Sequence, residues 1–164
     1  MSEFMRICLG ARAAVLVFVV LVLLSGAYLS GFRISFNVSG SLPHRVFLTV
    51  RGGEISCGPR SIGLFRLNVR NPYWDYGTVF AKRFVGCPGD TLRARGREFY
   101  LNGKRVAVAS GHDSKGVAVS SFRFDGVIPA GSYFVLGDWE RSYDSRYWGF
   151  VRKSWILGRG FPLF

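Results

Sequence analysis

A membrane-length run of uncharged residues near the amino terminus constrains this chain more than any other feature. From Ala13 to Phe32 the sequence carries no charged side chain, and Arg12 and Arg33 flank the run. An α-helix of this length spans about 30 Å, which is the thickness of the hydrocarbon core of a bilayer. A helix on the surface of a soluble domain would show a polar face, which this run lacks. We therefore expect a transmembrane anchor over residues 13–32.

Charge around the run predicts its orientation. Arg6 and Arg12 lie in the short segment 1–12, which favours a cytoplasmic amino terminus. Residues 33–164 are then expected on the periplasmic side of the inner membrane, behind a single-pass anchor. The alternative is a signal peptide cleaved at small residues near Ala27 or Gly31. The run is longer than the apolar region of ordinary signal peptides, which favours the retained anchor.

The composition of residues 33–164 indicates a mainly β domain. The chain contains 15 Phe, 7 Tyr and 21 Gly, and no long amphipathic helical pattern follows residue 33. Asn102-Gly103 between two apolar runs is the favoured hairpin turn. We expect irregular loops over 57–77 and a mobile loop over 110–119. The expected strands are 45–51, 78–85, 99–101, 105–107, 121–124, 132–136 and 154–164.

The charge and the cysteine content exclude some classes of function for this chain. The net charge is +12, but no basic tract, zinc-ligand spacing or helix-turn-helix pattern accompanies it, so we expect no nucleic-acid partner. The two histidines are isolated and no Cys-x-x-Cys pair is present, so we expect no metal or other cofactor. Cys57 and Cys87 would share an oxidising compartment if the domain is exported. Either a disulfide or two buried thiols fits this pattern.

Three separated segments carry residues suited to nucleophilic catalysis. They are Ser39-Gly40-Ser41-Leu42-Pro43, the run from Lys82 to Asp90, and Gly137-Asp138 followed by the run from Ser142 to Gly149. A serine hydroxyl needs a neighbouring base, and a lysine can serve if desolvation lowers its pKa. Phe80 and Phe84 would supply an apolar wall for Lys82. From the residues alone, a surface lysine at 82, a simple turn serine at 41 and a basic role for His44 all stay open.

These segments together resemble the type I signal peptidases, a family of membrane-anchored Ser/Lys proteases, over residues 13–164. The resemblance implies a signal-peptidase-like β catalytic domain with Ser41 as nucleophile and Lys82 as general base. It implies that Ser39 helps to hold the oxyanion and that Ser142 hydrogen-bonds the lysine amine. Asp144 and Arg146 would form a supporting ion pair in which Arg83 also takes part.

Two departures from the usual family pattern point to one branch of it. Pro43 follows Ser41 by two positions rather than three, and the segment after Gly137-Asp138 is one residue shorter before Ser142. The first spacing is similar to that of TraF-type peptidases, which process pilin precursors in conjugation systems. We therefore expect cleavage of signal or leader sequences from exported precursors, with pilin precursors as the favoured substrates. The alternatives are a general housekeeping signal peptidase and an inactive peptide-binding β-domain of a secretion complex.

Overall fold

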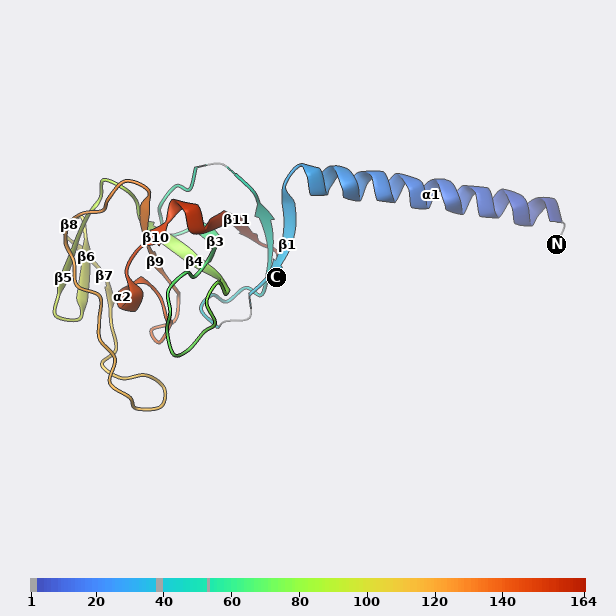
Figure 1. Ribbon diagram of the computed structural model, residues 1–164. Helices are drawn as coiled ribbons and strands as arrows, with labels where there is room; N and C mark the ends of the chain where they lie inside the picture. The colour runs from blue at the N-terminus through green and yellow to red at the C-terminus, as the bar shows by residue number, and fades with distance from the viewer. Residues whose placement is uncertain (1–2, 38–39, 53) are drawn as a thin grey trace.

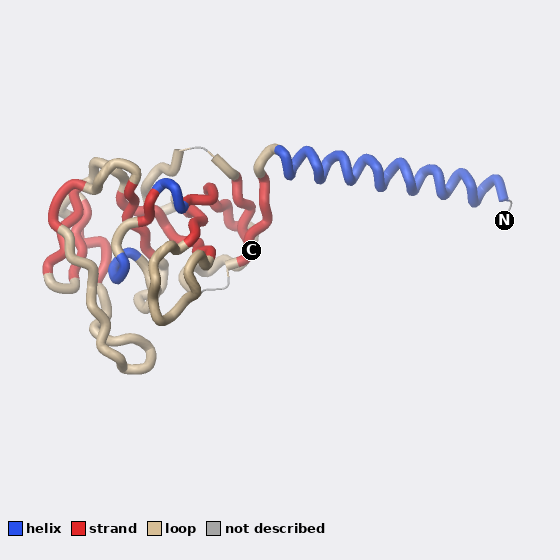
Figure 2. Tube along the Cα trace, viewed as in Figure 1, coloured by secondary structure: helices blue, strands red, loops and turns tan. Residues whose placement is uncertain are grey.

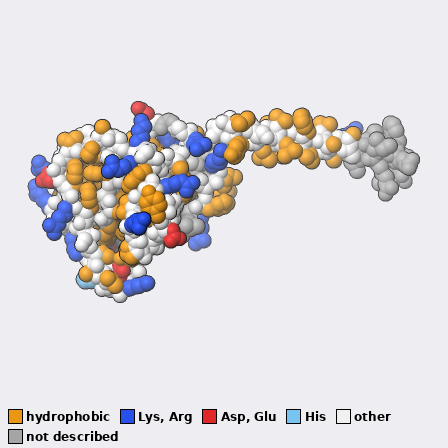
Figure 3. Space-filling model, in the orientation of Figure 1, with side chains coloured by type: hydrophobic (Ala, Val, Ile, Leu, Met, Phe, Trp, Pro, Cys, Tyr) orange, Lys and Arg blue, Asp and Glu red, His pale blue; other side chains and the backbone are white. Residues whose placement is uncertain are grey.

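The computed structural model describes residues 3–37, 40–52 and 54–164, and its first element is a long helix. Helix α1 spans Glu3–Leu29 and projects from the β-rich part of the chain (Figure 1). Its segment Gly10–Leu29 has a mean hydropathy of 2.3, and none of it is buried by the rest of the protein. The helix ends before the predicted boundary, because Gly31 has a φ of +82° and Phe32 already begins a strand. Figure 3 shows hydrophobic side chains along α1 and cations spread over the β-rich part.

Seven strands form the larger sheet, with the order β1-β2-β11-β3-β4-β9-β10. Every neighbouring pair in it is antiparallel. The interior strand β4, between β3 and β9, carries Lys82, and its neighbour β9 leads into the segment that carries Ser142. The strands are β1 (Phe32–Phe36), β2 (Val46–Val50), β3 (Ile62–Arg66), β4 (Val79–Gly86), β9 (Ser132–Leu136), β10 (Val151–Arg152) and β11 (Ile156–Pro162).

Four strands form a smaller sheet, with the order β7-β6-β5-β8. The predicted hairpin is confirmed, because β6 pairs with β7 and both turn residues, Asn102 and Gly103, have positive φ angles. Outside α1, the described residues form helical structure only in two short elements, which Figure 2 draws in blue. The remaining elements are β5 (Thr91–Arg95), β6 (Glu98–Leu101), β7 (Lys104–Val108), β8 (Asp125–Val127), the helix α2 (Ser145–Trp148) and the 3-10 turn η1 (Lys153–Trp155).

Most strand predictions are confirmed, but the loop predicted over 57–77 and the strand predicted over 121–124 are wrong for identifiable reasons. The segment 57–77 was expected to be irregular, but it contains β3, in which Ile62 to Phe65 are all buried. A strand buried on both faces shows no alternation of polar and apolar residues, so the sequence pattern does not indicate a strand there. Residues 121–124 do alternate, yet they form no ladder. Phe122 donates its N–H to Arg146 at 2.7 Å, whereas the carbonyl of Phe124 accepts from Ala94 at 2.8 Å.

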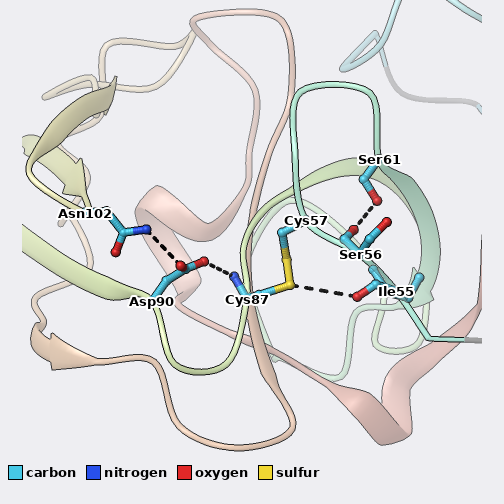
Figure 4. Close-up of a disulfide and its surroundings, with 7 residues drawn as sticks. All are labelled: Ile55, Ser56, Cys57, Ser61, Cys87, Asp90 and Asn102. Atoms are coloured by element: carbon cyan, nitrogen blue, oxygen red, sulfur yellow. Dashed lines mark hydrogen bonds between the residues drawn. A yellow bond between two sulfur atoms is a disulfide. The ribbon is translucent and has the colours of Figure 1, made fainter.

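A disulfide joins Cys57 and Cys87 across 30 positions of the sequence, with their Cα atoms 5.6 Å apart (Figure 4). It ties the loop before β3 to the end of β4, the strand that carries Lys82. The same junction is held by Asp90, whose carboxylate accepts the N–H of Cys87 at 2.8 Å and the side-chain amide of Asn102 at 2.8 Å. The disulfide therefore ties the end of β4 to the loop before β3, and Asp90 ties it to the β6–β7 turn of the smaller sheet.

Candidate active site

The structure brings Ser41, Lys82 and Ser142 together from three segments. Ser41 lies in the turn before β2 and is 6% exposed. The next residue, Leu42, is buried in an apolar cluster with Phe47 and Ala81, so packing fixes the position of the turn. The predicted oxyanion residue Ser39 lies outside the described residues.

Lys82 is buried in the middle of β4 with 1% of its surface exposed. Side chains at alternate positions of a strand share a face, so Lys82 lies between the core residues Phe80 and Phe84. The Nζ atom is 5.3 Å from the centre of the Phe80 ring. The pKa of Lys82 is lowered from 10.5 to about 8, chiefly because this apolar surrounding desolvates the ammonium; Asp144 opposes the decrease and Arg146 contributes to it.

The Lys82 amine contacts both serine hydroxyls. Its Nζ donates to the Oγ of Ser142 at 2.7 Å and also lies in hydrogen-bond contact with the Oγ of Ser41. A neutral amine has two protons and one lone pair, so it can donate to Ser142 while accepting the proton of Ser41. The arrangement therefore meets the geometric requirement for a serine nucleophile with a lysine base.

A buried ion pair holds the loop that presents Ser142. Asp144 caps α2 by accepting the N–H of Arg146, and it also accepts from Nε and Nη2 of Arg146 at 2.8 Å each. Arg146 donates in addition to the carbonyls of Glu140 and Ser142, at 2.8 and 3.0 Å. Because one rigid guanidinium ties both ends of this short loop, it fixes the position of the Ser142 hydroxyl.

Arg83 contacts a different partner from the one expected. It forms a two-pronged contact with Asp138, in which the Nη2–Oδ2 distance is 2.6 Å, and its Nη1 donates to the carbonyl of Pro59 at 2.7 Å. The backbone N–H of Asp138 donates to the carbonyl of Ser41 at 2.7 Å. Arg83 and Asp138 therefore position the Ser41 turn and take no part in the Asp144–Arg146 pair. Arg83 sits on the opposite face of β4 from Lys82, which explains the separation.

Gly137 is a site residue to which sequence reasoning gave no role. A Cβ atom at this position would lie 2.1 Å from the Oγ of Ser142 and 3.0 Å from the carbonyl oxygen of Ser41. Its N–H donates to Asp144 at 3.0 Å. The signal was present in the Gly137-Asp138 motif, but only the packed structure shows that a side chain here would displace both serines.

Ser41, Lys82 and Ser142 open into a cleft of about 730 Å³. This volume lies in the range of ligand-binding clefts. His44 is not among the residues that line it, and its ring packs edge-on against Phe47 at 6.3 Å. Within the described ranges, no three His, Cys, Asp or Glu side chains converge as a metal site would require. Aromatic side chains form much of the lining: Tyr73, Trp74, Phe80, Trp139, Tyr143 and Tyr147.

Known proteins resemble this chain over long stretches. A probable signal peptidase I-2 of Synechocystis is 37% identical over 92 residues, which cover 55% of this chain and 40% of that protein. The conjugal transfer protein TraF of Agrobacterium fabrum is 34% identical over 85 residues, covering 51% of this chain and 47% of that protein. The chain thus spans about half the length of these curated relatives.

A solved structure and a family description complete the comparison. The crystal structure of a signal peptidase I from Enterococcus faecalis is 31% identical with a TM-score of 0.41, and the match covers 65% of this chain and 98% of that one. The family described as "Signal peptidase, peptidase S26" matches residues 7–164, which is nearly the whole chain. The chain therefore belongs to the signal peptidase family, peptidase S26.

Proposed function

We propose that the protein is a membrane-anchored serine endopeptidase that cleaves signal or leader sequences from exported precursor proteins. One observation carries the proposal: the buried Lys82 amine contacts the hydroxyls of both Ser41 and Ser142 at the base of the cleft. Burial lowers the pKa of this lysine to about 8, so a useful fraction is neutral near physiological pH. Membership of the signal peptidase family supports the same reaction.

The proposed reaction proceeds through an acyl-enzyme. Neutral Lys82 takes the proton of Ser41 as its Oγ attacks the scissile carbonyl carbon, and the resulting ammonium then protonates the departing amine. Lys82 then deprotonates a water that attacks the ester, and the ammonium so formed protonates the leaving Oγ of Ser41 as the new carboxyl terminus is released. Ser142 orients the amine throughout. We propose Ser39, which lies outside the described residues, as an oxyanion donor beside the N–H of Ser41.

The charged residues around this pair are proposed to position it. Asp144 and Arg146 hold the Ser142 loop through buried hydrogen bonds. Arg83 holds Asp138, whose N–H contacts the carbonyl of Ser41. None of these groups would exchange protons with the substrate. Their loss would act through the geometry of the serine and lysine side chains.

Membrane placement is the second part of the proposal. We assign residues 1–12 to the cytoplasm, 13–32 to the anchor and 33–164 to the periplasmic side of the inner membrane. The apolar helix α1, exposed along Gly10–Leu29, supports the anchor. The Cys57–Cys87 disulfide supports an oxidising location for the domain, since cytosolic thiols are kept reduced.

One face of the larger sheet suits contact with the bilayer. Ile34 and Phe161 both lie opposite Leu48, so the three side chains form one row across β1, β2 and β11. Ile34 is 65% exposed, and Phe36 two residues further along the same face is 70% exposed. This apolar face begins at Phe32, directly after the helix, so we propose that it rests on the membrane surface.

Cleavage of a precursor by the purified full-length protein tests the proposal. The wild type in detergent should cut a precursor within its leader region, and Ser41→Ala should reduce the rate to background with an unchanged circular dichroism spectrum. Ser154→Ala, a surface change outside the cleft, should keep full activity. Cleavage by Ser41→Ala at more than a few per cent of the wild-type rate would remove Ser41 from the role of nucleophile.

We propose pilin precursors of a conjugation or type IV secretion system as the preferred substrates. The spacing of Ser41 and Pro43 and the similarity to a conjugal transfer protein support this choice. The general signal peptidases among its relatives support the alternative of a housekeeping enzyme. Parallel assays decide between them: a kcat/KM at least tenfold higher for a pilin precursor than for an unrelated secretory precursor supports the first, and a ratio near one supports the second.

A further inference from the structure

Two loops from distant parts of the sequence border the outer part of the cleft. The first connects β3 to β4 over residues 67–78, and the second connects β7 to β8 over residues 109–124. Figure 1 shows both loops at the lower edge of the β-rich part, below the sheets. Residues of both loops line the cleft that holds Ser41 and Lys82.

The second loop is held internally around Asp113. Its Oδ1 atom accepts the N–H groups of Lys115 and Val117 at 2.8 and 2.9 Å. His112 forms an isolated β-bridge with Ala118, so the segment folds back on itself. Both of these N–H groups bond to Oδ1, so the second carboxylate oxygen of Asp113, Oδ2, takes no part in the two bonds.

The first loop presents Tyr73 in a fixed direction. The side-chain oxygen of Asn71 accepts the N–H groups of both Tyr73 and Trp74 at 2.9 Å, which makes a tight local turn. The ring of Tyr73 packs edge-on against Tyr143 with 5.0 Å between the ring centres. These backbone hydrogen bonds and the packing against Tyr143 thus fix the position of the Tyr73 phenol within its own loop.

The hydroxyl of Tyr73 donates to the Oδ2 atom of Asp113 at 3.0 Å and joins the two loops. Tyr73 is 39% exposed, whereas Ser41 and Lys82 are buried, so this contact lies at the outer rim of the cleft. We propose that Tyr73 and Asp113 form a clasp that opens whenever a polypeptide occupies the cleft and continues beyond it on both sides.

The proposal rests on the proposed endopeptidase function and adds a substrate preference to it. A precursor that is held in the membrane at one end and carries a folded domain at the other cannot thread under a closed contact. A short peptide that ends inside the cleft can enter without disturbing it. The clasp therefore disfavours long precursors relative to short peptides, and Tyr73 and Asp113 help to determine which substrates are cut. One exposed hydrogen bond to a carboxylate corresponds to about a fivefold effect.

The test compares two substrates with the same cleavage segment, one a short peptide and one a precursor with a folded domain after the cleavage site. Full-length wild type, Tyr73→Phe and Tyr76→Phe are assayed in the same detergent. Tyr73→Phe keeps the ring and removes the hydroxyl. Tyr76→Phe makes the same chemical change in the same loop at a residue 66% exposed and outside the cleft lining. We expect the precursor-to-peptide ratio of kcat/KM to rise about fivefold in Tyr73→Phe and to stay at the wild-type value in Tyr76→Phe.

A ratio unchanged in Tyr73→Phe, or raised equally by Tyr76→Phe, would overturn the clasp. Amide hydrogen exchange of residues 110–119 gives a second measurement that needs no substrate. Tyr73→Phe should speed exchange in this segment relative to both other proteins, and equal exchange in all three would overturn the clasp. If the wild type cuts neither substrate, the endopeptidase proposal fails, and the exchange result alone then decides whether the clasp exists.

Discussion

The protonation of Lys82 gives the most quantitative prediction, and Lys82→Met is the change that tests it. An unfolded lysine has a pKa near 10.5, whereas burial lowers the pKa of Lys82 in the folded protein to about 8. This difference corresponds to about 3 kcal/mol by which the ammonium is disfavoured in the folded state. Methionine has a similar volume, and its side chain does not titrate.

The sign of the pH effect follows from proton counting. Below pH 8 both states of the wild type bind the Lys82 proton, so the stability cost is present in full. Between the folded pKa of about 8 and the unfolded value of 10.5, only the unfolded state keeps the proton. The free energy of unfolding therefore rises with pH across this window. Relative to Lys82→Met, the wild type should gain about 2 kcal/mol between pH 7.5 and pH 10.

Urea unfolding followed by tryptophan fluorescence measures this difference. Other groups titrate alike in both proteins, so they cancel when the two stabilities are subtracted. Parallel stability curves for wild type and Lys82→Met over this pH range would show that Lys82 titrates like an exposed lysine. The reasoning that makes it a base at neutral pH would then be wrong.

Three further changes test the supporting structure. Gly137→Ala adds a methyl group whose carbon would lie 2.1 Å from the Oγ of Ser142. We therefore expect kcat in a peptide cleavage assay to fall about 100-fold while the circular dichroism spectrum stays that of the wild type. Activity near the wild-type value would contradict the packing. Replacing both Cys57 and Cys87 by serine opens a loop of 30 positions and should lower the free energy of unfolding by about 3–4 kcal/mol in urea, whereas an unchanged midpoint would show that the disulfide does not form. Arg146→Lys keeps the charge but loses the two-pronged contact, so thermal unfolding should show a loss of about 3 kcal/mol, and equal stability would refute its role as the tie of the loop.

The parts of the fold that follow local rules could be predicted from the sequence. The Asn102-Gly103 turn needs two positive φ angles, and these residues accept them easily, so the hairpin was evident. Strand β4 is β-branched and aromatic around Lys82, and it too was expected. Strand β3 was missed because all of Ile62 to Phe65 is buried and the polar–apolar alternation disappears.

The candidate site was predictable in its members and less so in its contacts. The family resemblance brought Ser41, Lys82 and Ser142 together, and the structure places their side chains in contact. Which carboxylate meets Arg83 depends on which face of β4 the side chain leaves. Tertiary packing decides that face, and in this structure it places the Arg83 guanidinium against Asp138. The Tyr73–Asp113 contact joins loops 40 positions apart and has no signature in the chain.

The central claim is that Ser41 is a nucleophile activated by a neutral Lys82, and the rate of covalent labelling measures it most directly. A peptide-based acylating electrophile with a short apolar side chain is added to the full-length protein at several pH values. Mass spectrometry then locates and quantifies the adduct. We predict acylation at Ser41 with a rate that rises with pH through a midpoint near the Lys82 pKa of about 8, and no labelling of Lys82→Met. An adduct on another residue, or equal labelling of Lys82→Met, would contradict the account.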